Sequence, residues 1–495
     1  MHIAILGNGI AGITAARFIR KLSDHDITVI SAETDHFFSR TALMYIYMGH
    51  LRYEDTKPYE DWFWEKNRIN LLRAYIERID FDKKTLYGSK GEELPYDKLL
   101  LATGSAPNKF GWPGQDLKGV SGLYSYQDLQ NMERFSDGLQ RAVIVGGGLI
   151  GIEMAEMFHS RHIPVTFLVR EDSYWDMVLP PEESAMVERH ILENGIDLRL
   201  STELKEIVDD GQGRACAVIT KDGERIECGY VGLTAGVHPN IGFLKGSGLE
   251  MQKGILVNDY LETNIPGVYA AGDCAQLRNP QPGRRAIEAV WYTGRMAGET
   301  AAYNICLPCG IFAETIPQGL PRGIDEATIP QGGPCGIFAE TIPQGLPRGI
   351  IPQGGQKAAY DPGIWFNSAK FIDIEYQVYG DVQANAPENH ASIYWEHPEG
   401  RKSIRLVYDK EQGHILGFNL MGVRYRHEVC EKWIAEETHI EEVLQNLGIA
   451  NFDPEFYEEY DEEAVRIYNR QSGRNLQLKK RRSLAGALRF LLNQA

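Results

Sequence analysis

Three glycines near the start of the chain have a spacing that can hold a phosphate. Gly7, Gly9 and Gly12 follow the apolar run 3–6 and open a helical pattern. Gly7 permits a tight turn, Gly9 lets a pyrophosphate touch the backbone, and Gly12 lets the helix pack on the strand. Free N–H groups at the start of the helix favour an anion there. We therefore predict a dinucleotide site whose first helical residues are Ile10 and Ala11.

An acid follows at the distance that such a site needs. The apolar run 27–30 indicates the second strand, and Glu33 comes shortly after it. In dinucleotide-binding folds an acid about 20 residues beyond the glycines accepts a hydrogen bond from a ribose hydroxyl. Glu33 is therefore a predicted ribose ligand.

A second glycine turn opens another strand, turn and helix pattern. The apolar run 142–145 leads into Gly146, Gly148 and Gly151, and a strand pattern follows at 165–169. Two dinucleotide sites in one chain indicate that one nucleotide coenzyme reduces another. We include Ile150, Glu153, Arg170 and Gly236 in this second site.

For a nicotinamide coenzyme in this second site, the choice between NADH and NADPH would depend on the residues that follow the strand pattern 165–169. Arg170 favours NADPH, because a guanidinium group binds the 2′-phosphate. Glu171 and Asp172 weaken that preference, since an acid here favours the free ribose hydroxyl of NADH. Both coenzymes therefore stay open.

Two buried strand patterns end in a glycine beside which a ligand can pass. The first ends in Ala102-Thr103-Gly104, where the glycine lets the chain cross close under a ligand. The second ends in Gly272 and Asp273, at the carboxyl end of a strand, which is where open α/β sheets hold ligands. Alternatively, or in addition, Asp273 caps the helical segment that follows it.

Length and composition describe a globular protein without a membrane-spanning segment. The 495 residues are 43% hydrophobic and 24% charged, which is ordinary for about two to four globular domains. No apolar run reaches about 18 residues, and the first strand pattern leaves no room for a cleaved signal, so we expect a cytoplasmic protein. The formal net charge of −17 argues against a general attraction to nucleic acid. The seven cysteines describe no disulfide framework, and we predict no metal site.

The glycine turns require two α/β domains, and strand patterns in the last third of the chain require an antiparallel one. The predicted fold class is α/β, with two Rossmann-like dinucleotide-binding domains plus a C-terminal antiparallel α+β domain. We expect strands at Arg225–Leu233, Phe371–Tyr379, Ser392–Glu396, Ser403–Tyr408 and His414–Met421. The predicted boundaries are 1–115 with 251–305 for the first dinucleotide domain, 116–250 for the second, 306–356 for an insertion, 357–445 for the C-terminal domain and 446–495 for an acidic and then basic tail.

The insertion consists of a proline- and glycine-rich unit in tandem copies. Residues 312–324 recur identically at 338–350, with a variant copy between them. Proline and glycine prevent a continuous helix or central strand, so we predict a flexible surface loop, with a docking surface as the alternative. Cys309 has the same place in its unit as Cys335, and its spacing from Cys306 therefore does not indicate a redox pair.

The tail ends in a basic stretch that precedes an apolar helical pattern. The basic residues 479–482 lead into apolar residues at spacings of three and four, namely Leu484, Ala487, Leu488, Leu491 and Leu492. Such a tail can fold back on the acidic block 453–463, bind an acidic electron-transfer partner, or lie on an anionic membrane surface. The third alternative would make the protein membrane-peripheral and its acceptor a quinone.

Together the motifs resemble those of the pyridine nucleotide–disulfide oxidoreductase superfamily of two-dinucleotide-fold flavoproteins. The matching segments are Gly7–Gly12 with Glu33, Leu101–Gly104, Gly146–Glu153, Gly236–Asn240 and Gly272–Asp273. A looser similarity relates residues 362–374 to the ferredoxin-reductase and nitrite-reductase-like branch. The resemblance implies NAD(P)H on the second domain and FAD on the first, where the predicted ligands include Arg40, Asp273 and Trp365 beside the ring.

Two departures from the family pattern affect the predicted function. No cysteine precedes Cys216, so the disulfide of the disulfide-reductase branch is missing. The family commonly places a lysine a few residues after Arg40, where it pairs with the glutamate that matches Glu153. Here Met44 and Tyr45 stand at that place, and the role of the ion pair is open.

The predicted function is an FAD-dependent NAD(P)H oxidoreductase that passes hydride from the nicotinamide to the flavin. Because an internal disulfide is missing, the electrons must go to an external acceptor such as a ferredoxin- or rubredoxin-like protein. The alternatives are a peripheral-membrane NADH:quinone oxidoreductase and a redox-sensing or scaffolding flavoprotein with little turnover. The sequence identifies neither the acceptor nor the oligomeric state, for which a homodimer is one alternative.

Overall fold

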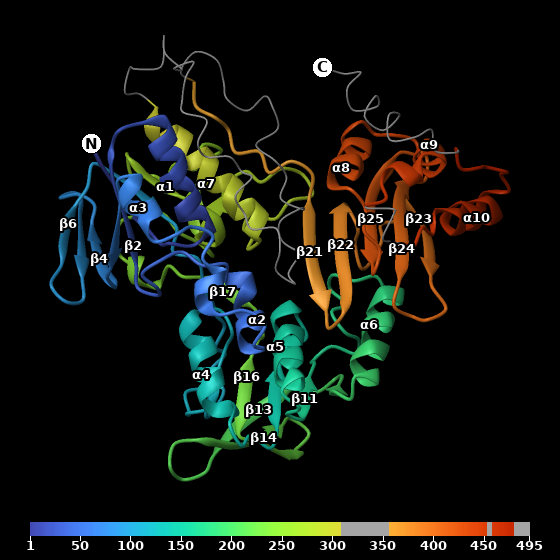
Figure 1. The fold of residues 1–495 in the computed structure, drawn as a ribbon, viewed down its shortest axis with the longest axis horizontal. Helices are drawn as coiled ribbons and strands as arrows, with labels where there is room; N and C mark the ends of the chain where they lie inside the picture. The colour runs from blue at the N-terminus through green and yellow to red at the C-terminus, as the bar shows by residue number, and fades with distance from the viewer. Residues whose placement is uncertain (308–355, 453–457, 480–495) are drawn as a thin grey trace. The chain divides into compact units, whose positions relative to one another are not determined.

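The computed structural model of the protein describes residues 1–307, 356–452 and 458–479. The tandem repeats, part of the acidic block and the end of the basic tail lie outside these residues, so what we predict for them stays a prediction. The chain forms two compact units (Figure 1). Unit one comprises Met1–Asn108, Gly122–Arg134 and Gly236–Pro362, and unit two comprises Lys109–Ser121, Phe135–Ala235 and Gly363–Ala495.

Unit one is built on a parallel sheet with the strand order β19-β7-β1-β2-β3. Its strands are β1 (His2–Leu6), β2 (Asp26–Ser31), β3 (Ile69–Arg73), β7 (Lys98–Leu101) and β19 (Val268–Ala270). The central strands read as continuous apolar runs, which is typical of a parallel sheet with both faces covered. This order brings the carboxyl ends of β1, β2, β7 and β19 to one edge of the sheet, where ligands bind in open α/β folds.

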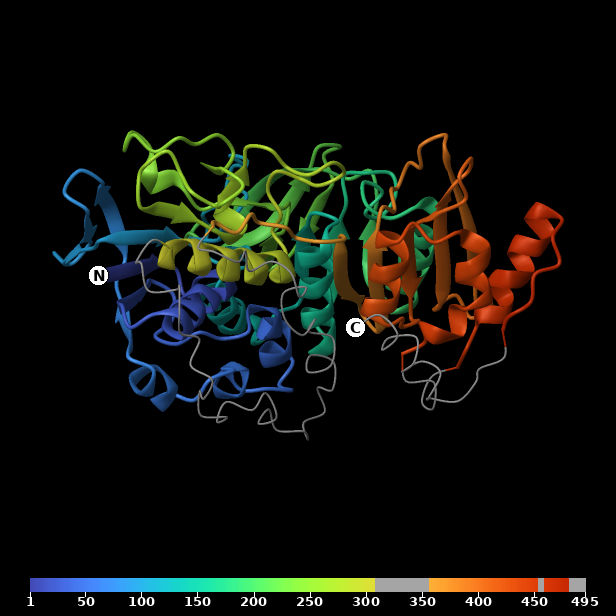
Figure 2. The same ribbon diagram turned by 90° about the horizontal axis from the view of Figure 1, so that it is seen from above.

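Two helices lie side by side in unit one, α1 (Ile10–Leu22) and α7 (Trp291–Cys306) (Figures 1 and 2). Their close approach depends on Gly298, because a Cβ atom there would lie 2.4 Å from the carbonyl oxygen of Ala11. The other elements of this unit are α2 (Leu43–Tyr47), α3 (Trp62–Lys66), β4 (Ile76–Asp80), β5 (Thr85–Gly88), β6 (Glu93–Pro95), β8 (Ser105–Pro107), β17 (Val237–Pro239), β18 (Ile255–Val257), β20 (Ala275–Leu277) and most of α4 (Tyr126–Ser136).

Unit two contains a second parallel sheet, with the order β12-β11-β10-β16-β9. The strands are β9 (Val120–Ser121), β10 (Ala142–Val145), β11 (Val165–Leu168), β12 (Asp197–Arg199) and β16 (Tyr230–Leu233), with the helices α5 (Leu149–Ser160) and α6 (Pro181–Glu193). An antiparallel sheet is formed by β13 (Leu204–Asp209), β14 (Ala215–Thr220) and β15 (Arg225–Glu227). The predicted single strand Arg225–Leu233 is therefore wrong. The chain divides at Cys228 and Gly229, because β15 pairs with β14 whereas β16 pairs with β10.

The C-terminal part of unit two is an antiparallel sheet with the order β21-β22-β25-β24-β23. Its strands are β21 (Phe366–Phe371), β22 (Ile374–Gly380), β23 (His390–Glu396), β24 (Ser403–Asp409) and β25 (Ile415–Met421), and the helices are α8 (His427–Ala435), α9 (Ile440–Gln445) and α10 (Asp461–Ser472). The predicted strand Phe371–Tyr379 is wrong at its start. A turn at Ile372, which has a φ of 60°, separates β22 from β21, a strand that we did not predict.

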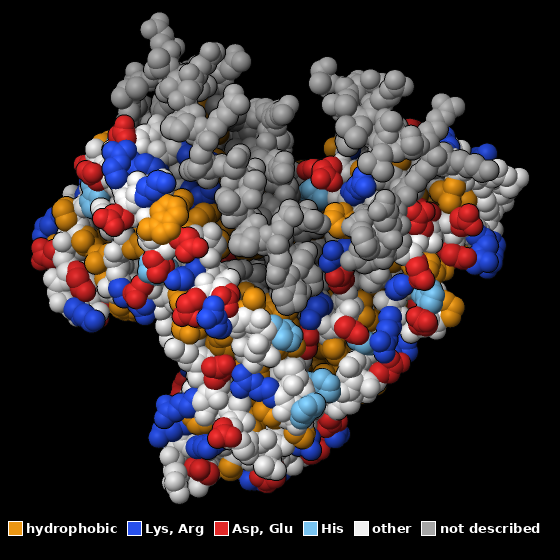
Figure 3. All heavy atoms as spheres, in the orientation of Figure 1, with side chains coloured by type: hydrophobic (Ala, Val, Ile, Leu, Met, Phe, Trp, Pro, Cys, Tyr) orange, Lys and Arg blue, Asp and Glu red, His pale blue; other side chains and the backbone are white. Residues whose placement is uncertain are grey.

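The surface carries charges of both signs. On the face drawn in Figure 3, Lys and Arg side chains are interspersed with Asp and Glu side chains. Among the described residues, no helix combines the length and the apolar composition that crossing a bilayer would require.

Candidate cofactor-binding sites

The first glycine turn joins β1 to α1 in a conformation that only glycine adopts easily. Gly7 has a φ of 120°, and a Cβ atom there would lie 2.0 Å from the carbonyl oxygen of Ala102. A Cβ atom on Gly12 would lie 2.0 Å from the carbonyl oxygen of Gly7, so the helix could not pack on the strand with any larger residue. Gly9 is different, because nothing lies within 4 Å of its added Cβ. The turn is thus closed on the side of the sheet and open at Gly9.

The second glycine turn, between β10 and α5, repeats this geometry. Gly146 has a φ of 118° and lies against Thr234, and a Cβ atom on Gly151 would lie 2.2 Å from the carbonyl oxygen of Gly146. Gly148 has no atom within 4 Å of an added Cβ. Gly9 and Gly148 are the N-cap residues of their helices, and neither helix has a side-chain cap. The first N–H groups of both helices are therefore available to an anion.

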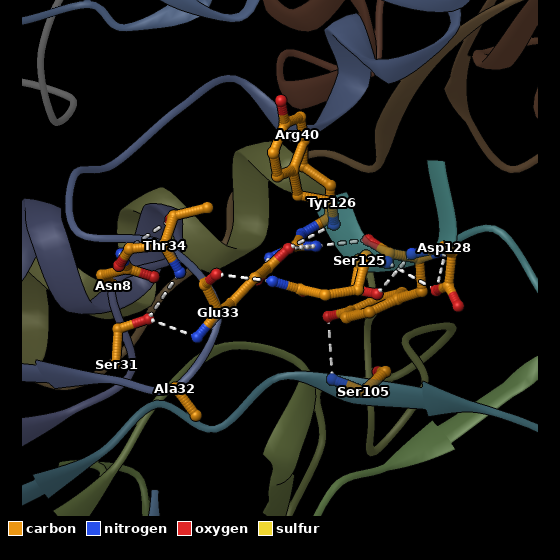
Figure 4. Close-up of polar contacts among 12 residues, drawn as sticks. Asn8, Ser31, Ala32, Glu33, Thr34, Arg40, Ser105, Ser125, Tyr126 and Asp128 are labelled. Carbon is orange, nitrogen blue, oxygen red and sulfur yellow. Dashed lines mark hydrogen bonds and ion pairs between the residues drawn. The ribbon is translucent and has the colours of Figure 1, made fainter. Parts of the chain in front are cut away.

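Glu33 lies after β2, and its side-chain carboxylate accepts three hydrogen bonds (Figure 4). The Arg40 guanidinium donates to both of its carboxylate oxygens, at 2.8 and 2.5 Å. The backbone N–H of Tyr126 donates to Oε1 at 2.8 Å, and the Gln127 amide donates to the carbonyl oxygen of Glu33 at 2.7 Å. Burial alone would lower the pKa of Arg40, but the hydrogen bonds and charge of Glu33 outweigh it and raise that pKa. Glu33 is thus an anchored acid rather than a free one.

Asn8 of the first turn fastens the segment after β2 in the same region. Its side-chain amide donates to the carbonyl oxygen of Thr34 at 3.0 Å and to the Thr34 hydroxyl at 3.2 Å (Figure 4). The Ser31 hydroxyl accepts a hydrogen bond from the backbone N–H of Glu33 at 3.1 Å. The glycine turn and the acid therefore keep a fixed mutual position.

Tyr124 connects the Glu33 region to Asp273. The ring of Tyr124 lies under the Arg40 guanidinium, with 4.6 Å from the central carbon of that group to the ring centroid. Its hydroxyl accepts a hydrogen bond from the backbone N–H of Ser105 at 2.8 Å and donates to Asp273 Oδ2 at 3.3 Å. The Ser105 hydroxyl donates to the same Asp273 oxygen at 3.0 Å. One polar network thus runs from the end of β2 to the end of β19.

Asp273 lies three residues beyond the end of β19, in the short helical turn Gly272–Cys274. The capping alternative is wrong for the next α-helix, because the N-cap residue of α7 is Val290. Burial raises the pKa of Asp273, while the hydrogen bonds from Ser105 and Tyr124 oppose that rise. The carboxylate is therefore a partly buried acceptor that the network holds in place.

The segment Ala102-Thr103-Gly104 lies at the centre of this arrangement. Ala102 contacts Gly7, and Gly104 has a φ of 67° and would, with a Cβ atom, lie 2.7 Å from the Tyr124 hydroxyl. Ile10 and Ala11 form the first turn of α1, and Ala11 lies 3.0 Å from an added Cβ on Gly272. In unit one, the structure thus brings together the predicted residues Gly7, Gly9, Ile10, Ala11, Gly12, Glu33, Arg40, Ala102, Thr103, Gly104 and Asp273.

The predicted residues of the second site have different positions. Ile150 lies in the first turn of α5 and Glu153 in the second turn. Arg170 is exposed after β11, with its Nη2 atom 2.7 Å from Glu171 Oε1. Gly236 belongs to unit one, where its carbonyl oxygen accepts a hydrogen bond from the backbone N–H of Asn108 at 3.0 Å. It directly follows Ala235, which contacts Gly146 in unit two.

Trp365 belongs to unit two and immediately precedes β21. Its carbonyl oxygen accepts a hydrogen bond from the backbone N–H of Gly380 at 2.8 Å, which fixes it at the edge of the C-terminal sheet. The expectation that Trp365 lies beside a flavin stays a prediction.

Sequence reasoning missed several residues of these networks. Tyr124 and Ser105 have no motif of their own. A signal was present nearby, since Ser125 and Asp128 form the pattern that starts a helix. The backbone N–H groups of Tyr124 and Ser125 donate to Asp128 Oδ2 at 3.0 and 2.8 Å. This cap fixes the start of α4 and places the N–H of Tyr126 against Glu33.

The fold and these sites define a protein with two dinucleotide-binding turns, each open at the start of a helix, and a separate antiparallel sheet. The chain belongs to the pyridine nucleotide-disulphide oxidoreductase family, whose model matches residues 1–297. Members of this family use FAD and NAD(P)H as cofactors. The open turns at Gly9 and Gly148 fit one dinucleotide each.

Among curated relatives, the chain is similar to the nitrite reductase (NAD(P)H) of Bacillus subtilis, with 31% identity over 281 residues. That match covers 56% of this chain but only 34% of the relative, so the chain spans about a third of that protein's length. It is also similar to the NADH-rubredoxin oxidoreductase of Clostridium acetobutylicum, with 29% identity over 64% of this chain and 77% of the relative. The structure of an NAD-dependent persulfide reductase from A. fulgidus has the same fold, with a TM-score of 0.76 and 22% identity, and the match covers 96% of this chain and 84% of that one.

Proposed function

We propose that the protein takes hydride from NAD(P)H through its bound FAD and delivers the electrons to a small iron–sulfur protein of the rubredoxin or ferredoxin kind. The observation that carries this proposal is the pair of glycine turns, one in each unit. In both turns the first and third glycines pack against the backbone, whereas the second, Gly9 or Gly148, has open space beside it. FAD, when bound, supplies a ring that accepts two electrons and releases them singly.

The residues of unit one would hold FAD by its polar parts. The open backbone at Gly9 and the uncapped start of α1 suit the pyrophosphate. Glu33 would accept a hydrogen bond from the adenosine ribose through a carboxylate lone pair that Arg40 and Tyr126 do not use. Arg40 would set the orientation of the carboxylate. Asp273, at the other end of the network, would accept a hydrogen bond from a hydroxyl group of FAD.

The residues of unit two would hold NAD(P)H in the same manner. Gly148 and the first turn of α5 suit the pyrophosphate of the coenzyme. Arg170 and Glu171 stand at the place that distinguishes the 2′-phosphate of NADPH from the 2′-hydroxyl of NADH. Residues 116–250 would form the coenzyme domain and residues 1–115 with 251–305 the FAD domain. Gly236 stays a predicted residue of the coenzyme site, and Trp365 stays a predicted residue of the FAD site.

The acceptor is external in this proposal. The sequence has no cysteine before Cys216, so the first dinucleotide segment offers no disulfide to the flavin. The named activity of the Clostridium acetobutylicum relative, NADH-rubredoxin oxidoreductase, supports a small iron–sulfur protein as the acceptor. The quinone alternative rests on the basic tail alone, whose apolar pattern lies outside the described residues.

The proposal is tested in two stages with the purified full-length protein. Its visible absorbance should show bound FAD, and NADH or NADPH added without oxygen should bleach that absorbance. Electrons should then pass to rubredoxin or to a ferredoxin faster than to a soluble quinone. If bound FAD is not reduced by either coenzyme, the proposed function is wrong. Reduction followed by preferred transfer to the quinone would overturn the assignment of the acceptor.

A further inference from the structure

We propose that Lys370, on strand β21 of the C-terminal sheet, is a positioning residue for the coenzyme reaction, because it sets the charge of a pair of glutamates on α5. The inference rests on the proposed function and names a regulator of that same site. The pair consists of Glu153 and Glu156, and α5 is the helix that begins at the second glycine turn.

The geometry places one cation against two acids. Glu153 and Glu156 are three residues apart on α5 and therefore share one face of the helix. Strand β21 runs beside α5 in unit two (Figure 2). The Lys370 ammonium nitrogen lies 2.7 Å from Glu156 Oε1, and the Glu156 side chain is only 7% exposed.

The second oxygen of Glu156 has an unusual environment. Glu156 Oε2 is buried and makes no hydrogen bond within the described residues. A buried carboxylate oxygen without a donor is costly, which favours the protonated form of the carboxyl group. Glu153 is the acid next to it on the helix, and the two would titrate as a pair rather than as separate groups.

The charged and titratable groups that face this pair come from three further elements. Lys370 comes from β21, and Asp373 comes from the turn after it and acts on Glu156 with a like charge. Tyr174 is buried in the segment after β11 and interacts with Glu153. With both glutamates ionised, two negative charges face one positive charge. Burial, followed by the charge of Glu156, raises the pKa of Glu153 to about 7, and Lys370 opposes this rise.

The charge of the pair acts on the coenzyme because of its place on α5. Glu153 lies just beyond the turn at Gly148, where the pyrophosphate of NAD(P)H is proposed to bind, and Tyr174 donates a hydrogen bond of 3.5 Å to the Gly148 carbonyl oxygen. The coenzyme, when bound, would supply hydride, and the loss of two electrons and a proton would leave its ring positively charged. A negative charge on Glu153 would favour that product, and a proton on the pair would remove this effect. The pair exchanges its proton with solvent and is not consumed.

Lys370 also accounts for a departure in the sequence. The family resemblance places a lysine after Arg40, where this chain has Met44 and Tyr45. The cation beside the glutamates of α5 comes instead from a strand more than 200 residues later in the chain, with a sequence separation of 214 between Glu156 and Lys370.

The first test measures the titration of the pair in the flavin-loaded protein without coenzyme. Infrared difference spectra report the protonated carboxyl band, which is assigned to the pair by its loss in Glu153→Gln. Lys370→Met should raise the midpoint by about one unit or more, because the cation no longer stabilises two ionised acids. Glu156→Gln should lower the midpoint, because the repulsion is gone, and Lys370→Arg should leave it close to the wild-type value.

The second test measures the rate of flavin reduction by NADH and NADPH over a pH range that spans neutrality. Its midpoint should move in the same directions as the infrared midpoint. Lys357→Met is the matched control, since Lys357 pairs with Glu262 at 2.8 Å on the surface of unit one and should change neither midpoint. Flavin absorbance and melting temperature show whether each variant is folded.

The outcomes separate this inference from the proposed function. If wild-type flavin is not reduced, the proposed function fails, and the infrared titration still decides whether Lys370 controls the pair. If wild-type flavin is reduced but both midpoints are the same in Lys370→Met, the inference is overturned. Should Lys370→Met not fold, Glu156→Gln decides, because an unchanged midpoint in that variant contradicts a coupled pair.

Discussion

The Arg40 guanidinium and the Glu33 carboxylate form a two-point ion pair, with N to O distances of 2.8 and 2.5 Å. Neither side chain is more than 29% exposed. A guanidinium group that binds both oxygens fixes the plane of the carboxylate, which a lysine cannot do. The acid proposed to bind the adenosine ribose is therefore oriented by a second residue before any cofactor arrives.

The first prediction follows from this pair. Arg40→Lys and Glu33→Gln should each weaken FAD binding by about tenfold, and the double variant should lose little more, because the two residues act as one unit. The measurement is a fluorescence titration of the apoprotein with FAD. Arg52→Lys is the control, since Arg52 binds Asp55 through two similar hydrogen bonds on the surface of the same unit. Fully additive losses would contradict a shared role.

The second prediction uses the open side of each glycine turn. Gly9→Ala adds a methyl group that meets no protein atom within 4 Å, so the apoprotein should keep its melting temperature while losing FAD. Gly148→Ala should keep FAD and weaken NAD(P)H binding. Gly242→Ala is the control, because it also has open space and no positive φ. A protein that keeps both cofactors in both variants would show that the pyrophosphates bind elsewhere.

The contrast between the turns and the network shows what sequence can predict. Gly7 and Gly146 were predictable because their backbone geometry is local and requires glycine. The hydrogen bond between the Tyr126 N–H and Glu33 joins residues 93 apart, and it forms only after residues 122–134 return to unit one. No periodicity or motif carries that information.

The C-terminal sheet shows the same limit. Its antiparallel class followed from strand patterns, yet β21 was missed, because the segment Phe366–Phe371 has polar and small residues between its two phenylalanines. The pairing of Lys370 with Glu156 depends on which helix this strand lies against. That choice is a property of the packed unit rather than of either segment.

A third prediction concerns the buried ion pair between Arg405 and Glu183 in unit two. The Arg405 Nε atom lies 2.7 Å from Glu183 Oε1, and the two side chains are 8% and 0% exposed. Arg405→Met leaves a buried carboxylate unpaired and should destabilise the unit by about 3–5 kcal/mol.

The double variant Arg405→Met with Glu183→Met removes both charges and should recover most of that loss. Urea unfolding of the three proteins, followed by circular dichroism, makes the comparison. If the double variant is as unstable as the single variant, the loss of stability does not come from an unpaired buried charge, and the prediction is wrong.

The fourth prediction is a pH dependence of stability that comes from Glu153. Burial, with the charge of Glu156, raises its pKa to about 7 from an ordinary 4.5. The folded state then holds a proton more tightly than the unfolded chain, so this contribution is complete below about pH 4.5 and is lost as the pH rises through about 7. The variant Glu153→Gln has no carboxyl group at this position and therefore does not lose this stability as the pH rises.

The melting temperature of Glu153→Gln relative to wild type should therefore increase between about pH 5 and about pH 8. The exposed variant Glu77→Gln should show no such trend. A constant difference across this range would mean that Glu153 is ionised equally in the folded and unfolded states.

The last prediction concerns coenzyme choice. Arg170 is 68% exposed, and its Nε and Nη2 atoms lie 3.1 and 2.7 Å from Glu171 Oε1. While Glu171 holds the guanidinium, the cation is only partly available to a 2′-phosphate. Glu171→Ala should release it and raise the ratio of kcat/KM for NADPH to that for NADH by about tenfold, whereas Arg170→Ala should lower the ratio. Arg225→Ala is the control, since Arg225 pairs in the same way with Glu227 on the same unit. If neither variant moves the ratio while the control also leaves it unchanged, Arg170 is a surface charge and coenzyme choice is made by other residues.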